Sequence, residues 1–210
     1  MLKFFKKLKK DKRGITLMEM VVAVAVFSVV IMMATDLYFV AQQSERKTTA
    51  IQKVQSDARY SLEAIAREIR VDKIDYQYYS NLTNQAEDTL SLFDSDGCRI
   101  LFRRSLDSSG ICQGMDSCLA VGLPPRNNGV CDNNLTHIVW TSLTPKNIIV
   151  DILHFYISPT VDPFAENSEI NEQPRVTIVF TSHNFSAASR PEDEKSLTIQ
   201  TTVSSRFYGK

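Results

Sequence analysis

The sequence predicts an α+β fold: a long N-terminal helix, transmembrane in its first half and amphipathic in its second, packed on an antiparallel β-sheet head. Two observations predict it. Residues 15–72 contain neither glycine nor proline, the two residues that most often end a helix. Beyond Lys73, short segments rich in apolar and β-branched residues alternate with turn residues, as in strands. A helix followed by a run of strands is typical of α+β domains.

Residues 1–14 form a basic segment ahead of the helix. They hold seven of the 24 basic residues and one of the 24 acidic residues of the chain. Such charge stays on the cytoplasmic side of a membrane, so we expect the rest of the chain beyond the cytoplasmic (inner) membrane. Loss of this segment would leave an acidic chain, which argues against a nucleic-acid-binding protein with a basic face. The charged residues are Lys3, Lys6, Lys7, Lys9, Lys10, Lys12 and Arg13, with Asp11.

Residues 15–41 are the apolar half of the predicted helix. Residues 20–34 carry no charge, and the whole stretch is long enough to span a bilayer. A basic segment before an apolar one is also found in cleaved secretory signal peptides. Residues 35–40 (TDLYFV) offer no convincing small-residue cleavage site, so a membrane anchor is the favoured interpretation.

One carboxylate, Glu19, interrupts this apolar stretch. A carboxylate inside a membrane costs a few kcal/mol and is by default a candidate functional residue. The alternative is an interfacial side chain that reaches toward the headgroups near a helix end.

Residues 12–25 (KRGITLMEMVVAVA) resemble the processing site of type IV prepilins and type II secretion pseudopilins. This resemblance implies a prepilin peptidase that cuts after Gly14 and N-methylates Ile15, and it makes Glu19 the fifth residue of the mature chain. Ile15 departs from the usual phenylalanine. Asp36 stands where many major pilins have a proline, which argues against a major-subunit role.

The chemistry of these residues agrees with the resemblance. After such a cut, Ile15 would carry a charged secondary amine in a low-dielectric environment, where opposite charges attract strongly. Glu19 lies one helical turn away, within reach of its own terminus or that of a neighbouring subunit. The resemblance implies that this pairing docks an incoming subunit in a filament core.

Residues 42–73 continue the helix and are amphipathic. Apolar residues recur at spacings of three and four, on one face of an α-helix. Charged residues lie opposite, with Glu63 and Arg67 in the order that favours an i,i+4 ion pair. The apolar face is expected to pack against the sheet. Its predicted members are Ile51, Val54, Ala58, Leu62, Ile65 and Ile69.

Residues 74–210 are predicted to form the β-rich head outside the cytoplasm. Its later strands alternate apolar and polar residues, as in antiparallel strands with one solvated face. Residues 94–97 (DSDG) predict a tight hairpin turn. The expected strands are 89–93, 98–103, 135–142, 148–158, 175–182 and 197–206.

Residues 61–70 and 197–206 are also similar to minor pilins and J-type minor pseudopilins, the low-copy subunits that initiate or cap a filament.

All four cysteines, Cys98, Cys112, Cys118 and Cys131, lie in one loop of the head, residues 98–131. An even number of cysteines outside the cytoplasm favours disulfides. Of the three possible pairings, the sequence favours Cys112–Cys118 nested inside Cys98–Cys131. Free or alternatively paired thiols are one alternative. A zinc site is another, but the spacing between Cys112 and Cys118 exceeds the usual short ligand spacing.

Residues 105–134 are otherwise rich in serine, asparagine, glycine and aspartate, and they predict a long inserted loop. Long ordered loops are often functional, so this one is a candidate contact surface for a partner; an inert loop is the alternative. Asp94, Asp96 and residues 127–134 suggest calcium ligands, but the spacing of an EF-hand loop is absent. Turn chemistry is the favoured interpretation.

No catalytic constellation is evident in the sequence. His137, His154 and His183 fall on separate predicted elements, and no phosphate loop, dinucleotide fingerprint or HExxH motif occurs. We therefore expect no enzyme, metal or cofactor.

The resemblance implies a minor pilin or pseudopilin in the inner membrane, later in a pilus or pseudopilus, with prepilin peptidase and other subunits as partners. An adhesion or DNA-uptake module on the same anchor is the first alternative, and a signal-anchored extracytoplasmic enzyme is the second.

Overall fold

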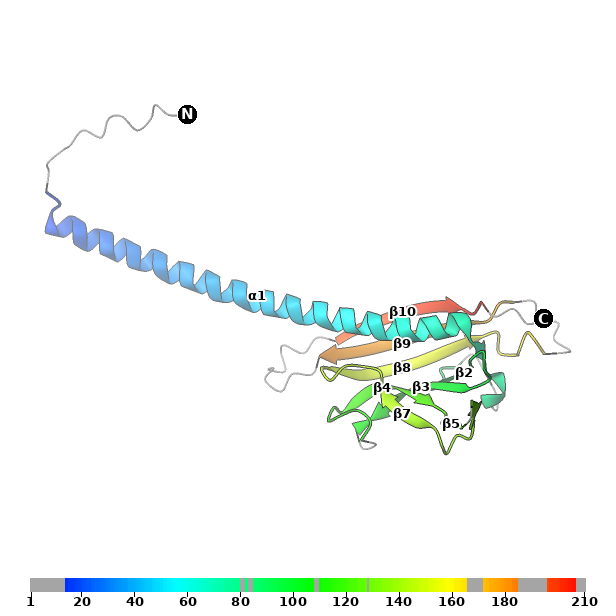
Figure 1. The fold of residues 1–210 in the computed structure, drawn as a ribbon. Helices are drawn as coiled ribbons and strands as arrows, with labels where there is room; N and C mark the ends of the chain where they lie inside the picture. Colours follow the sequence, from blue (N-terminus) through cyan, green and yellow to red (C-terminus); the bar gives the residue numbers. More distant parts are fainter. Residues whose placement is uncertain are drawn as a thin grey trace, which may run out of the picture. The chain divides into compact units, whose positions relative to one another are not determined.

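A computed structural model gives the fold (Figure 1). The description covers residues 14–79, 82, 85–107, 110–127, 129–165, 172–184 and 196–206. The basic residues of the predicted leader before Gly14 lie outside these ranges. The chain divides into two compact units, one ending at Lys47 and the other beginning at Thr48.

One helix, α1 (Leu17–Val71), contributes to both units and contains 55 residues. It confirms the prediction of a continuous helix over residues 15–72 to within two residues at its start and one at its end. All residues from Gly14 to Ala41 are exposed, although most of them are apolar. Within the described residues, α1 is the one helix long and apolar enough to cross a membrane.

In the second unit, α1 buries one stripe of side chains. Five of the six predicted positions are buried, with Ile65 and Ile69 fully inaccessible. Ile51 was expected in this stripe, but it is 40% exposed because the buried part of the helix begins at Val54. The predicted ion pair of Glu63 with Arg67 is also wrong: Arg70 lies 2.7 Å from Glu63, and Arg67 pairs with its neighbour Glu68.

The described residues of the head form three antiparallel sheets. The first has the order β1-β2-β3-β4-β7, the second β10-β9-β8, and the third is the β5-β6 ribbon. A 3-10 turn, η1 (Tyr76–Tyr78), follows β1. The strands are β1 (Lys73–Ile74), β2 (Thr89–Phe93), β3 (Arg99–Leu106), β4 (Ser117–Leu123), β5 (Arg126–Asn127), β6 (Val130–Cys131), β7 (Val139–Ser142), β8 (Ile148–Ser158), β9 (Arg175–Asn184) and β10 (Ser196–Ser204).

The prediction of one long loop over residues 105–134 is wrong. Strand β4 (Ser117–Leu123) runs through it and pairs with both β3 and β7. Its residues Leu119 and Ala120 are fully buried, so both faces of the strand are covered. A strand buried on both faces has no apolar–polar alternation, and the surrounding glycines, serines and prolines conceal it in the sequence.

The two larger sheets and α1 share one hydrophobic core. Strand β8 links the sheets: Glu87, just before β2, exchanges two backbone hydrogen bonds with Phe155 of β8, each with an N–O distance of 2.8 Å. The second half of α1 runs along the three-stranded sheet (Figure 1). The largest fully buried side chains are Phe155, Phe180, Ile65, Ile69, Ile74, Leu90, Leu92, Leu119, Ile148 and Ile178.

A buried carboxyl group marks the end of α1. Asp72 is only 3% exposed, and its Oδ2 atom has no hydrogen-bond partner among the described residues. Burial, followed by the nearby charges of Glu68 and Asp94, raises the pKa of Asp72 to about 7. Its backbone carbonyl accepts a hydrogen bond from Ser205 just after β10, so this carboxyl lies where the helix and the sheet are joined.

The raised pKa of Asp72 predicts that the head loses stability as pH rises from about 4 to about 7. The folded state holds this proton more tightly than the unfolded chain does, so the contribution is complete near pH 4 and lost above pH 7. Asp72→Asn should remove the dependence and stabilise the head by up to about 4 kcal/mol at pH 8. Denaturant unfolding of residues 48–210 at several pH values measures it. Exposed Asp116, changed to Asn, is the control, and an unchanged slope in Asp72→Asn would contradict the assignment.

Candidate functional site

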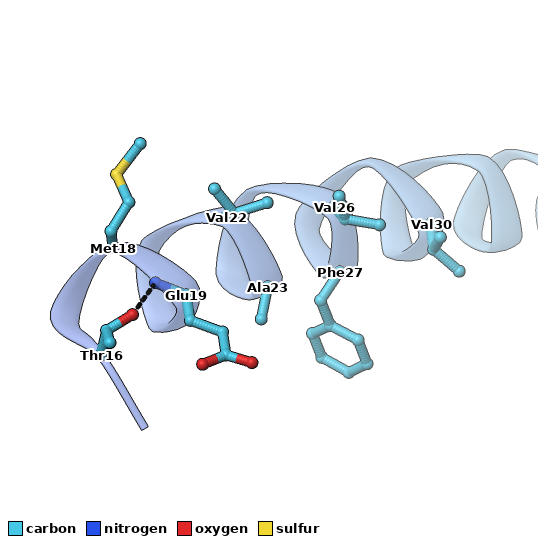
Figure 2. A pocket seen from close by; sticks show the side chains of 8 residues that line it. All are labelled: Thr16, Met18, Glu19, Val22, Ala23, Val26, Phe27 and Val30. Atoms are coloured by element: carbon cyan, nitrogen blue, oxygen red, sulfur yellow. Dashed lines mark hydrogen bonds between the residues drawn. The ribbon is translucent and has the colours of Figure 1, made fainter. Parts of the chain in front are cut away.

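The side chain of Thr16 stabilises the N-terminus of α1. Its Oγ1 atom accepts a hydrogen bond from the backbone N–H of Glu19, with an N–O distance of 3.2 Å (Figure 2). Threonine is a favoured residue before the first helical position because it satisfies one of the free N–H groups there. Its own carbonyl accepts from Met20, so Thr16 is the N-cap of the helix. Gly14 and Ile15 therefore precede the helix.

Glu19 lies in the first turn of α1. A negative charge there interacts favourably with the helix dipole. Figure 2 shows its side chain on the same side of the helix as Ala23 and Phe27, one and two turns further on. Other side chains around it are apolar, including Met18 and Val22. Among the described residues, Glu19 is thus the one acidic residue on the apolar surface of the first turns of α1.

Gly14 has no structural reason to be glycine. A Cβ atom placed there would meet nothing within 4 Å, and its φ is not in the left-handed region. By contrast, Gly97 has a φ of +76° in the turn before β3, a conformation that glycine adopts at little cost. The fold therefore requires Gly97 but not Gly14, and any requirement for glycine at position 14 comes from another molecule.

A family model for the prokaryotic N-terminal methylation motif matches residues 9–35. This match covers the basic residues just before Gly14, then Gly14, Ile15 and Glu19, and most of the apolar first half of α1. The chain carries the N-terminal signature of type IV prepilins and pseudopilins. Its α+β architecture, a long helix packed against antiparallel sheets, is pilin-like. No curated protein and no solved structure matches the chain.

Two disulfides crosslink the pilin-like head, one at the β2–β3 turn and one in the connection from β3 to β4. The structure joins Cys98 to Cys131 and Cys112 to Cys118, with Cα–Cα distances of 5.4 Å in both pairs. These are the pairs that the sequence favours. Asn133 reinforces the first one: its amide donates to the Gly97 carbonyl and its oxygen accepts from the Arg99 N–H, both at 2.8 Å.

The acidic residues of this turn have basic or backbone partners. Asp94 and Asp96 face Arg126 at 3.2 and 3.5 Å, and Asp94 also accepts hydrogen bonds from the backbone N–H groups of Asp96 and Cys98. Among the described residues, no group of three or more metal-binding side chains occurs. The turn chemistry expected from the sequence is therefore observed at Asp94.

The three histidines lie apart, each next to a different aspartate. His137 contacts Asp132, His154 contacts Asp88, and His183 contacts Asp151 at 2.8 Å. The hydrogen bond from His137 holds the pKa of exposed Asp132 below its usual range. The pilin-family motif implies a structural subunit rather than an enzyme.

Thr16 is the site residue that sequence reasoning missed. Its signal was present: a threonine three residues before a glutamate, followed by an apolar run, is a helix N-terminus signature. Gly14, Ile15 and Glu19 came from the processing motif, whereas the position of the cap determines that Gly14 and Ile15 lie outside the helix.

Proposed function

We propose that this chain is a minor subunit of a type IV pilus-like or type II secretion filament. Prepilin peptidase removes residues 1–14 and N-methylates Ile15; residues 15–41 anchor the subunit in the inner membrane and later line the filament core. Residues 42–73 carry the head, residues 74–210, outside the cytoplasm. The observation that supports this proposal is the methylation motif over residues 9–35.

The exposed apolar surface of α1 supports the anchoring and assembly steps. From Ile15 to Val40, the large apolar side chains are about half exposed or more, which is far more apolar surface than a soluble monomer leaves in water. Lipid covers such a surface before assembly. In a filament, the same surfaces of neighbouring subunits cover one another, because helix contacts in an apolar environment depend on close packing and on a few polar pairs.

The position of Glu19 supports a role as one member of such a polar pair, with a cleaved N-terminal amine as the other. The cleaved N-terminus at Ile15 is a cation, and Glu19 lies in the first turn of the helix within reach of it. An unpaired charge in a low-dielectric core is costly, so subunits that bring Glu19 and an N-terminal amine together are favoured over those that do not. The minor-subunit assignment is supported by Asp36, which stands where many major pilins have a helix-softening proline.

Glu19→Val tests the docking role. We expect the variant to be cleaved and methylated normally but to be incorporated at least tenfold less into sheared filaments, since it cannot neutralise an N-terminal amine. The measurement is quantitative immunoblotting of the filament and membrane fractions from cells that make the peptidase and partner subunits.

Asp36→Val provides the matched control, because Asp36 is an acidic residue of the same helix, 17 positions further from the cleaved end. It should be incorporated close to the wild-type level. Equal incorporation of Glu19→Val and wild type would contradict the docking role, even if processing at Gly14 proved correct.

A further inference from the structure

The outer edge of β10 is an exposed template for strand pairing. β10 (Ser196–Ser204) pairs with β9 at all nine of its positions. It is the end strand of its sheet, and no other described strand pairs with its second edge (Figure 1). A strand edge of this length presents a row of unpaired backbone N–H and C=O groups to any extended chain that approaches it.

The protection usual for such edges is missing from β10. Its nine residues (SLTIQTTVS) contain no charged residue, proline or glycine, and its register with β9 has no irregularity. Natural edges are commonly protected by charge, proline, a bulge or shortness. The other described edges follow that rule: β7 has four residues and β1 two, while β8 has a register shift between Val150 and Ile152.

The hydrogen bonds at the end of β10 identify the groups that face outward. Ser205 donates its N–H to Pro174, the residue before β9. Backbone groups alternate in direction along a strand, so the N–H and C=O groups of Thr198, Gln200 and Thr202 point away from β9. Arg206, two steps further along that series, donates its N–H to the Arg70 carbonyl at the end of α1. One outward-facing backbone N–H of this series, that of Arg206, therefore already donates a backbone hydrogen bond.

A groove between α1 and β10 would receive side chains of an added strand. It has a volume of about 590 Å³, and its walls include Tyr60, Leu62 and Ala66 from the helix and Ile199 from the strand. Its charged residues are Arg59, Glu63 and Arg70. A second, polar hollow beside it is lined by Arg70 and Arg206. The two hollows therefore present three arginines against one glutamate, and they favour an acidic partner.

We propose that the outer edge of β10 binds an extended, acidic segment of another polypeptide by strand addition. The segment would pair with the backbone of Thr198, Gln200 and Thr202. It would place an apolar side chain against Tyr60 and Ile199, and carboxylates near the arginines. Main-chain hydrogen bonds supply affinity in this mode of recognition, and the side-chain pocket supplies specificity. The inference rests on β10 and the second half of α1, and it is independent of processing at Gly14.

Gln200→Pro tests the edge. Proline removes the outward N–H of residue 200 but none of the hydrogen bonds to β9, and proline is tolerated at an edge of this kind. Gln200→Thr keeps the N–H and is the matched control. The probe is a fluorescent eight-residue peptide with threonine at every second position and valine or glutamate at the others, so that both kinds of side chain face the groove. It is titrated by anisotropy against the full chain in detergent micelles. We expect saturable binding that weakens at least tenfold in Gln200→Pro and less than threefold in Gln200→Thr.

A charge variant keeps the proposal testable if Gln200→Pro fails to fold, which its circular dichroism would show. Arg59→Glu should weaken binding of the glutamate peptide and improve binding of the same peptide with lysine in place of glutamate. No saturable binding by wild type, or equal binding by wild type and Arg59→Glu, would overturn the proposal. A third result is that wild type binds no peptide but self-associates, and that Gln200→Pro abolishes this self-association. The acidic-partner proposal would then be wrong, and the edge of β10 would bind a second copy of the chain.

Discussion

Replacing Gly14 by leucine is expected to abolish maturation, leaving essentially all of the chain as the uncleaved precursor. The reason lies in another molecule and not in the fold of this chain, because a Cβ atom added at Gly14 meets nothing within 4 Å beyond its chain neighbours. The substitution should therefore leave the fold intact and block only the approach of the peptidase to the bond between Gly14 and Ile15. Intact mass of the membrane-extracted chain, made with the peptidase, measures the cleaved fraction.

Ile15→Leu is the matched control for this experiment. It places a large apolar residue on the other side of the same bond, where the mature chain would begin, and it should be processed at close to the wild-type level. Normal cleavage of Gly14→Leu would show that the peptidase does not read this glycine, and the processing assignment would be wrong.

Removing the Cys98–Cys131 disulfide is expected to destabilise the head by about 3–4 kcal/mol. The two residues are 33 positions apart, so the crosslink restricts a long loop in the unfolded chain, and it connects the start of β3 with the β5–β6 ribbon. Replacing both cysteines by alanine removes the crosslink. Denaturant unfolding of residues 48–210 under oxidising conditions gives the change in the free energy of unfolding.

The Cys112–Cys118 disulfide gives an internal comparison. It closes a loop of only six positions, so its removal should cost about 2–3 kcal/mol by the same chain-entropy argument. A loss of less than about 1 kcal/mol for the Cys98–Cys131 pair would contradict the proposed contribution of the longer loop.

The sequence predicted most of the fold where the pattern was local. Helix α1 was predictable because no residue between positions 17 and 71 breaks a helix. Strands β2 and β8 have the predicted bounds, since turn residues flank both. Strand β4 was missed because it is buried on both faces and lies among turn-forming residues. Ile51 was misplaced because periodicity cannot show how far along the helix the sheet extends.

The candidate site was predictable for a different reason. Gly14, Ile15 and Glu19 lie within one short motif, so their spacing in the sequence carries the information. The cap at Thr16 has a local signature as well. The exposed edge of β10 has no such signature, because the sheet order β10-β9-β8 depends on contacts between distant parts of the chain. Only the structure shows which long strand lies at an edge.

The central claim is that this chain is a prepilin-type precursor. The most direct test is the intact mass and N-terminal fragmentation of the wild-type chain, made with and without a prepilin peptidase. The account predicts a chain that begins at methylated Ile15 with the peptidase and at Met1 without it. A chain that begins at Met1 in both cases, or one cut after the apolar half of α1, would contradict it.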